Sequence, residues 1–167
     1  MHIFLTGYMG VGKTTIGGEI SEVLHLPFID LDKSIEKQSE KIIAELFLTE
    51  GEEGFRQIEH KALLSAIAQK EQHVISLGGG TIAHLKNHEI ILQNGVCIYL
   101  YKPWKEIEKD IKSLPNRPLT SSLSTNELEA LFIKREPFYE LSQLKVPINT
   151  EFDSQKLAQK LRLSTNR

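Results

Sequence analysis

An eight-residue segment near the start of the chain limits the possible folds more than any other feature. It matches the pattern G-x-x-x-x-G-K-[ST] and reads Gly7-Tyr8-Met9-Gly10-Val11-Gly12-Lys13-Thr14. The apolar residues before it predict a strand, and the helical spacing of Ile16, Ile20 and Val23 after it predicts a helix. A glycine-rich turn between a strand and a helix can wrap its backbone N–H groups around a polyphosphate. The segment therefore predicts nucleotide binding at this turn.

The residue types in this loop suit the parts of a nucleoside triphosphate. The backbone N–H groups cradle phosphate oxygens, the lysine adds a full positive charge to the β- and γ-phosphates, and the hydroxyl of Thr14 suits Mg²⁺. A glycine-rich turn with a surface lysine is the alternative, but it leaves the spacing unexplained. The predicted ATP-binding residues here are Gly10, Val11, Gly12, Lys13, Thr14 and Thr15.

Short apolar runs alternate with longer helical patterns along the chain. This alternation is typical of an α/β fold, in which a parallel sheet is joined by helices. A chain of 167 residues that is 40% hydrophobic can bury one substantial core, so we expect a single domain over 1–167. The expected strands are His2 to Thr6, Pro27 to Asp30, His73 to Leu77, Val96 to Tyr101 and Lys145 to Ile148.

Residues 112–125 interrupt this alternation. Their composition shifts to Ser, Thr, Pro, Leu and Asn with little charge, and no helical period survives. Long loops of this kind usually serve a function, so we expect a flexible lid. Arg117 is its one arginine, and an arginine on a closing lid can neutralise phosphates during transfer. A solubilising loop charge is the alternative.

Charge and cysteine content exclude several classes. The net charge of −2 gives no argument for nucleic acid or a membrane surface as the main partner. Cys97 is the one cysteine and lies in an apolar run, which predicts a buried thiol and excludes a disulfide within the chain. The first residues are too short an apolar stretch for a secretory signal, so we expect a cytoplasmic protein.

Two carboxylates close the second expected strand, in the run Asp30-Leu31-Asp32. Ligands of open α/β sheets bind at the carboxyl ends of the strands, so both side chains can face a cleft. One carboxylate could hold hydrated Mg²⁺ while the other accepts a proton from a substrate hydroxyl. An acidic start to a helix is the alternative for both.

Arg56 lies near the start of another expected helix, three residues before Glu59. That spacing lets the carboxylate orient the guanidinium, although an arginine at a helix start is often only a solvated surface group. The run Gly78-Gly79-Gly80 ends the third strand and lets a ligand approach the backbone amides, unless it is a simple flexible turn.

Arg135 continues the helical stripe of Leu128, Leu131 and Phe132, where an apolar residue would ordinarily stand. An arginine there is expected to point into a cleft, with a snorkelling side chain as the alternative. His84 and His88 are spaced i, i+4 on an expected helix, but a third ligand is missing nearby. We therefore interpret the two histidines as a chance surface placement.

Together these residues resemble the shikimate kinase family, in order and spacing, over nearly the whole chain. The resemblance rests on the loop with Lys13 and Thr14, Asp30-Leu31-Asp32, Phe55-Arg56 with Glu59, Gly78-Gly79-Gly80, Arg117-Pro118-Leu119, and Arg135 with Tyr139. It implies a P-loop NTPase fold of the nucleoside monophosphate kinase type, with a five-stranded parallel sheet flanked by helices. It also implies transfer of the γ-phosphate of ATP to the 3-hydroxyl of shikimate.

The resemblance also implies a role for each residue. Arg56 and Arg135 would clamp the shikimate carboxylate, whose charge and planar shape suit two guanidinium groups. Asp32 would hold the acceptor hydroxyl, and Asp30 would support Mg²⁺ through water. Arg117 would arrive with the lid, and the three glycines, Gly78, Gly79 and Gly80, would line the acceptor pocket. We expect a monomer with ATP and shikimate as substrates and Mg²⁺ as cofactor.

The chain departs from the family pattern at three places. Lys109-Asp110-Ile111-Lys112-Ser113 stands where the family often has an arginine against adenine, so Lys109 or Lys112 could substitute. Thr120 replaces a common leucine, and Pro137 is expected to break or kink the helix that carries Arg135.

Other functions stay open at this point. A gluconate kinase of the same fold also binds a carboxylate, and a non-catalytic ATP-binding module would bind nucleotide without turnover. A GTPase is less well supported because the chain has no N-K-x-D segment.

Overall fold

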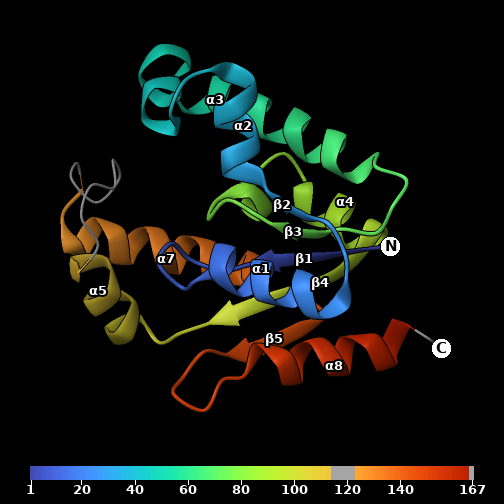
Figure 1. Cartoon of the computed structure of the whole chain (residues 1–167). Coiled ribbons are helices and arrows are strands. Elements are labelled where there is room, and N and C mark those ends of the chain that lie inside the picture. Colours follow the sequence, from blue (N-terminus) through green and yellow to red (C-terminus); the bar gives the residue numbers. More distant parts are fainter. Residues whose placement is uncertain (114–122, 166–167) are drawn as a thin grey trace.

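The computed structural model describes residues 1–113 and 123–165, which form one parallel sheet with helices on both faces (Figure 1). The strand order is β2-β3-β1-β4-β5. Each neighbouring pair is parallel, so the predicted α/β class and five-stranded sheet are confirmed. The strands are β1 (His2–Thr6), β2 (Phe28–Asp30), β3 (Val74–Ser76), β4 (Gly95–Tyr101) and β5 (Leu144–Pro147).

Helices join consecutive strands, as parallel pairing requires. Within the described ranges they are α1 (Lys13–Leu24), α2 (Leu31–Ser39), α3 (Ile43–Ile67), α4 (Asn87–Asn94), α5 (Trp104–Ser113), α7 (Thr125–Tyr139) and α8 (Ser154–Thr165), with a 3₁₀ turn η1 (Thr81–Ala83).

The central strand β1 is buried on both faces because its side chains alternate between two apolar clusters. Ile3 and Leu5 pack with residues of α1 and α8, whereas Phe4 packs on the other face with residues of α2, α3 and α7. Figure 1 shows α8 on one side of the sheet and the α2–α3 pair on the other. Burial on both faces fixes β1, and with it the start of the loop that follows.

The sheet order brings three sequence motifs to one edge. β2, β3 and β1 are neighbours, with Asp30 paired to Ser76 and Ser76 paired to Leu5 in register. Parallel strands end at the same edge, so the segments that follow these three strands meet there. These segments are the Gly7–Thr14 loop, the start of α2 and the triple glycine.

The ends of the expected lid need correction. α5 continues through Ser113, with Ile107 and Ile111 buried one turn apart, and α7 begins at Thr125. The start of α7 is capped by Ser124, whose Oγ accepts from the backbone N–H of Glu127. Residues 112, 113 and 125, which the lid was expected to include, are therefore helical. Arg117 and Thr120 lie outside the described residues.

The structure corrects two further expectations about local structure. Pro137 does not break α7, which continues to Tyr139, because the missing N–H removes a single bond near the end of the helix. His84 and His88 do not share a helix, since Leu85 and Lys86 between them have φ of 49° and 56°. In the described part of the chain, no group of three acidic, histidine or cysteine side chains is arranged for a metal.

Cys97 is fully buried in β4, as its apolar surroundings predicted, and burial raises the pKa of its thiol to about 11. Among the described residues, we find no helix with the length and apolar character needed to cross a membrane.

Candidate functional site

Glycines shape the turn between β1 and α1. Gly7, Gly10 and Gly12 have φ of 143°, 83° and 94°, a region that side chains of other residues strain to adopt. The ammonium of Lys13 donates to the carbonyl oxygens of Gly7 at 2.8 Å and Tyr8 at 3.0 Å, which holds the positive charge over the loop. The loop leads directly into the N-terminus of α1, where backbone N–H groups are unpaired within the helix. This arrangement suits a polyphosphate.

The other residues predicted to bind ATP differ in the exposure of their side chains. The side chain of Val11 is buried in the core, so only its backbone can contribute to a phosphate site. Thr14 and Thr15 are exposed on the first turn of α1, where their hydroxyl and N–H groups are accessible.

A hydroxyl and a carboxylate meet beside this loop. Thr14 Oγ1 donates to Asp30 Oδ2 at 2.6 Å, while Asp30 Oδ1 accepts from the N–H of Lys33 at 3.1 Å. Asp30 thus caps α2 and also faces the start of α1. Both oxygens are of the hard type that Mg²⁺ prefers, and Mg²⁺ commonly takes few protein ligands together with waters and phosphates. These two residues fit a nucleotide-bound Mg²⁺.

Arg56 is a buried cation in the second part of α3. It is 6% exposed, and its Nη1 donates to Glu59 Oε2 at 2.8 Å, the contact that their spacing predicted. The rings of Phe47 and Phe55 stack with centroids 4.3 Å apart and lie 5.7 and 5.2 Å from the guanidinium carbon. These contacts exclude a solvated surface role and hold the guanidinium in a fixed orientation.

Arg135 comes from α7 and is also 6% exposed. A methyl group at Gly80 would lie 2.7 Å from Arg56 Nη2 and 3.0 Å from Arg135 Nη2, so both guanidinium groups converge on this glycine. The Nε atoms of both arginines are buried, and neither has a hydrogen-bond partner among the described residues. Buried like charges are costly unless an anion offsets them, so the convergence favours an anionic ligand.

Asp32 lies on the other side of the glycines. A methyl group at Gly78 would lie 2.7 Å from Asp32 Oδ1 and 2.8 Å from Glu59 Oε1. Burial, and after it the nearby Glu59 charge, raise the pKa of Asp32 to about 6, although the Lys13 charge acts in the opposite direction. At neutral pH the group is an ionised carboxylate with unusual basicity, as a proton acceptor requires.

Two contacts near the site were not predicted from the sequence. Tyr139 donates from its hydroxyl to the carbonyl oxygen of Gly79, four residues after Arg135 on the same face of α7. Thr81 Oγ1 donates to Glu59 Oε1 at 2.7 Å. For Tyr139 the helical spacing was an available signal, whereas Thr81 offered only its place directly after the glycines.

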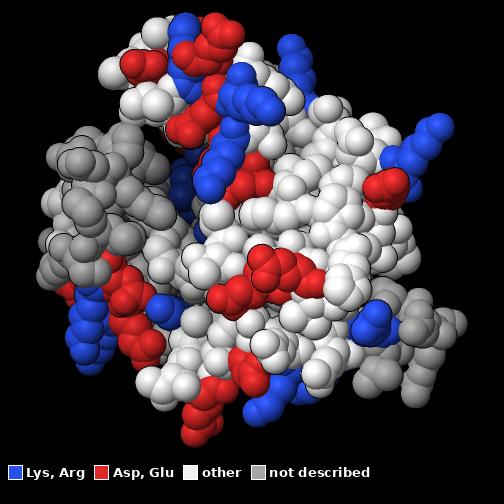
Figure 2. Space-filling model, in the orientation of Figure 1, with Lys and Arg blue, Asp and Glu red and all other residues white. Residues whose placement is uncertain are grey.

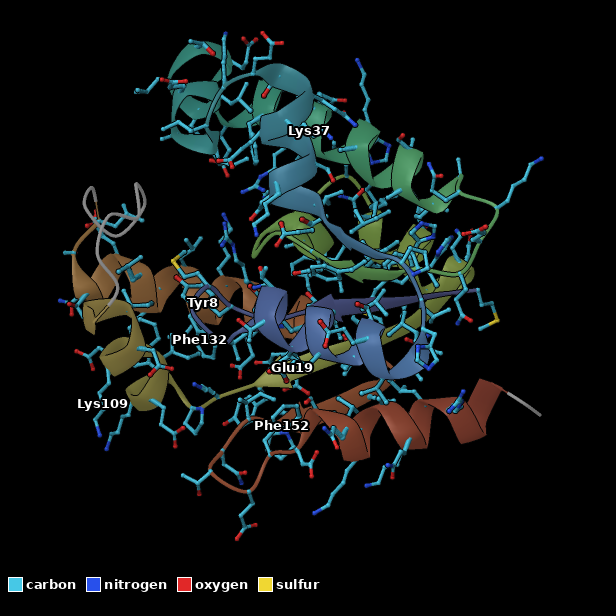
Figure 3. All side chains as sticks on the ribbon, viewed as in Figure 1. Tyr8, Glu19, Lys37, Lys109, Phe132 and Phe152 are labelled. Atoms are coloured by element: carbon cyan, nitrogen blue, oxygen red, sulfur yellow. The ribbon has the colours of Figure 1, made fainter. Side chains whose placement is uncertain are left out.

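Tyr8 links the loop to α7. Its hydroxyl donates to the carbonyl oxygen of Leu128 at 2.8 Å, and its ring meets Phe132 edge-on with centroids 5.4 Å apart. Figure 3 shows Tyr8 and Phe132 side by side at this junction. Tyr8 occupies a variable position of the motif, so the sequence carried no signal for this contact.

The candidate site and a second groove of the molecule differ in charge. Figure 2 shows basic atoms inside a recess beside the α2–α3 region. A groove of about 760 Å³ between α1 and α8 instead contains Glu19, Glu22 and Asp153 beside Phe152, and Figure 3 shows Glu19 and Phe152 there. Acidic walls repel phosphates and carboxylates, so an anionic substrate fits the recess and not the groove.

Comparison with known proteins agrees with this geometry. The family model described as shikimate kinase matches residues 9–165. This chain belongs to the shikimate kinase family. A shikimate kinase of Chlorobium phaeobacteroides is 37% identical over 158 residues, covering 89% of this chain and 79% of the relative. One from Azobacteroides pseudotrichonymphae is 43% identical over 142 residues, covering 82% and 84%.

Solved structures extend the match to three dimensions. Shikimate kinase from Bacteroides thetaiotaomicron superposes with a TM-score of 0.86 at 32% identity, covering 100% of this chain and 99% of that one. Shikimate kinase from Acinetobacter baumannii in complex with shikimate gives 0.85 at 33%, covering 99% and 94%. A gluconokinase from Sinorhizobium meliloti, at 17% identity and a TM-score of 0.61, shares the fold alone. As a shikimate kinase family member, the chain is a phosphate-transferring enzyme.

Proposed function

We propose that this shikimate kinase family member transfers the γ-phosphate of ATP to the 3-hydroxyl of shikimate, giving shikimate 3-phosphate and ADP, with the residues described above in named roles. The observation that carries the proposal is the convergence of Arg56 and Arg135 over Gly80, beside the basic carboxylate of Asp32. A carboxylate clamp next to a proton acceptor fits a hydroxy acid. The relative solved with shikimate supports the same choice.

The acceptor is bound by charge and shape. The two guanidinium groups offer paired N–H donors to the planar carboxylate of shikimate, and the bare backbone of Gly79 and Gly80 leaves room for the ring. Asp32 accepts the proton of the 3-hydroxyl as its oxygen attacks the γ-phosphorus. The bond from this phosphorus to the β–γ bridging oxygen breaks, and ADP leaves.

The nucleotide is bound mainly by the loop. Lys13 and the backbone N–H groups of Gly10 to Thr15 neutralise the β- and γ-phosphates, which is the main task in phosphoryl transfer. Thr14 and, through water, Asp30 would hold Mg²⁺, which supplies further positive charge between the phosphates. The role of Arg117, a monomeric state and a cytoplasmic location stay predictions of the sequence.

The direct test is release of ADP measured with ATP, Mg²⁺ and shikimate. We expect ADP formation that requires shikimate and that gluconate does not replace. Turnover with gluconate and none with shikimate would contradict the proposal. Nucleotide binding without ADP formation on either acid would instead indicate a non-catalytic module.

A further inference from the structure

We propose that Thr81, Asn87 and His60 are positioning residues, which hold Arg56 in place through Glu59 and set its distance from the triple glycine. The identity of the ligand in this inference rests on the proposed function. The contacts themselves form a continuous hydrogen-bonded chain from His60 to Arg56 on the described residues.

The first step is the orientation of Glu59. Its side chain is 1% exposed, and its two oxygens have different partners: Oε2 accepts from Arg56 and Oε1 accepts from the hydroxyl of Thr81. Hydrogen bonds to a charged acceptor are strong, and a buried carboxylate oxygen left without one is costly. Loss of the Thr81 hydroxyl would therefore let the carboxylate turn, and Arg56 would move with it.

The second step fixes Thr81. Its carbonyl oxygen accepts from Asn87 Nδ2 at 2.8 Å, and both residues are fully buried. Because a carbonyl can only accept, the nitrogen of the Asn87 amide must face Thr81, and the amide oxygen must face His60 Nδ1, 2.6 Å away. The His60 ring therefore carries a proton on Nδ1, which it donates to the amide oxygen.

The third step is the geometry of α3. Arg56, Glu59 and His60 are spaced i, i+3 and i+4, so they share one face of the helix. This face is joined at two points, Thr81 and Asn87, to the segment that directly follows Gly80. The relative position of α3 and the glycines, which sets the clamp, is thus held by side chains outside the pocket.

The decisive test compares Thr81→Val, which keeps the shape and removes the hydroxyl, with Thr81→Ser, which keeps the hydroxyl. We expect Thr81→Val to raise the KM for shikimate about tenfold, the effect of losing one buried bond of this kind, with the KM for ATP within about twofold of wild type. Thr81→Ser should restore the shikimate KM. An unchanged shikimate KM in Thr81→Val, or equal losses for both substrates, would overturn the inference.

A second pair tests the other end of the chain and serves if Thr81→Val does not fold. His60→Asn can keep an N–H near the position of Nδ1, whereas His60→Leu removes it. We expect only His60→Leu to raise the shikimate KM while leaving that for ATP unchanged. Equal shikimate KM values for the two variants would contradict a positioning role.

A spectroscopic measurement separates this inference from the proposed function. Nitrogen NMR of ¹⁵N-histidine-labelled wild-type protein should show a proton on Nδ1 of His60, without any reaction taking place. A ring protonated on Nε2 alone would overturn the hydrogen-bonded chain. Absence of shikimate-dependent ADP formation in the same sample would refute the proposed function and leave the His60 result standing.

Discussion

The nucleotide side and the acceptor side of the site are built in different ways. The proposed nucleotide side is one continuous turn, from Gly7 to Thr14, whose glycines have positive φ and whose single lysine bonds back to the loop carbonyls. The acceptor side takes side chains from α2, α3 and α7, which converge on the triple glycine, and Arg56 among them is held by Glu59. In the proposed function, local backbone geometry would recognise phosphate, whereas the packing of helices distant in sequence would recognise the acceptor.

This difference has a consequence for substitutions. A change in the loop should affect catalysis with little change in the acceptor pocket. A change on the acceptor side should affect binding of one substrate while the other still binds. Substitutions on the two sides should therefore differ in the kinetic constant that they change.

Lys13→Ala should have the largest effect. Removing the charge over the β- and γ-phosphates should lower kcat about a thousandfold, as loss of a transition-state donor does in other enzymes. The matched control is Lys37→Ala, which removes an exposed lysine on α2. Shikimate-dependent ADP release would measure both variants. A near-normal rate in Lys13→Ala would exclude the phosphate role.

Asp32→Asn should lower kcat about a hundredfold, because the amide cannot accept a proton. In the wild type, kcat/KM for shikimate should fall as pH drops through about 6, the pKa of Asp32. A profile that stays flat between pH 7 and pH 5 would argue against Asp32 as the base.

The raised pKa of Asp32 should also make the stability of the protein depend on pH. Its folded pKa of about 6 lies above the ordinary 3.8, so its contribution to stability is present at pH 4 and is lost as pH rises through 6. Asp32→Asn should therefore melt at a higher temperature than wild type at pH 8, and the difference should shrink at pH 4. Thermal melts without ligands measure this, and the opposite trend would contradict the burial of the charge.

Arg135→Ala tests the acceptor side alone. Loss of a buried, charge-paired contact costs about 2 to 5 kcal/mol, which corresponds to a loss of shikimate affinity of about thirtyfold or more, with ATP binding retained. Lys134→Ala, an exposed neighbour on α7, is the control. Calorimetric titration with each substrate would check this, and an unchanged shikimate affinity would remove Arg135 from the clamp.

Tyr8→Phe should have the smallest effect. It removes one buried hydroxyl, whose bond to Leu128 contributes about 1 kcal/mol, so the melting temperature should fall by about 2 to 4 °C. Both KM values should stay within about twofold, because the ring contacts remain. A large rise in the KM for ATP would show that the bond shapes the loop itself.

Much of this molecule could be predicted from residues that lie close in sequence. The strands could be predicted because short apolar runs are bounded by turn residues. The phosphate-binding loop could be predicted because its motif consists of eight adjacent residues. Arg135 could be identified as a candidate site residue because a charge interrupts an apolar stripe on its helix. Each of these signals is local, and the structure buries the Arg135 side chain on α7.

The hydrogen bonds that support Arg56 could not be predicted from the sequence, because they join segments that only the fold brings together. Thr81 is 22 residues from Glu59, and Asn87 is 27 residues from His60, with no shared periodicity to indicate either pair. The continuation of α7 through Pro137 was missed because tertiary packing outweighs one absent helical bond.

The helix α7 contacts both the nucleotide side and the acceptor side of the site. α7 meets the Gly7–Thr14 loop through Leu128 and Tyr8. About 10 Å further along its axis it presents Arg135, and about 16 Å further it holds Gly79 through Tyr139. If ATP changes the affinity for shikimate through this helix, shikimate must change the affinity for ATP by the same factor. Two titrations, each substrate measured with and without the other, would give one shared coupling constant.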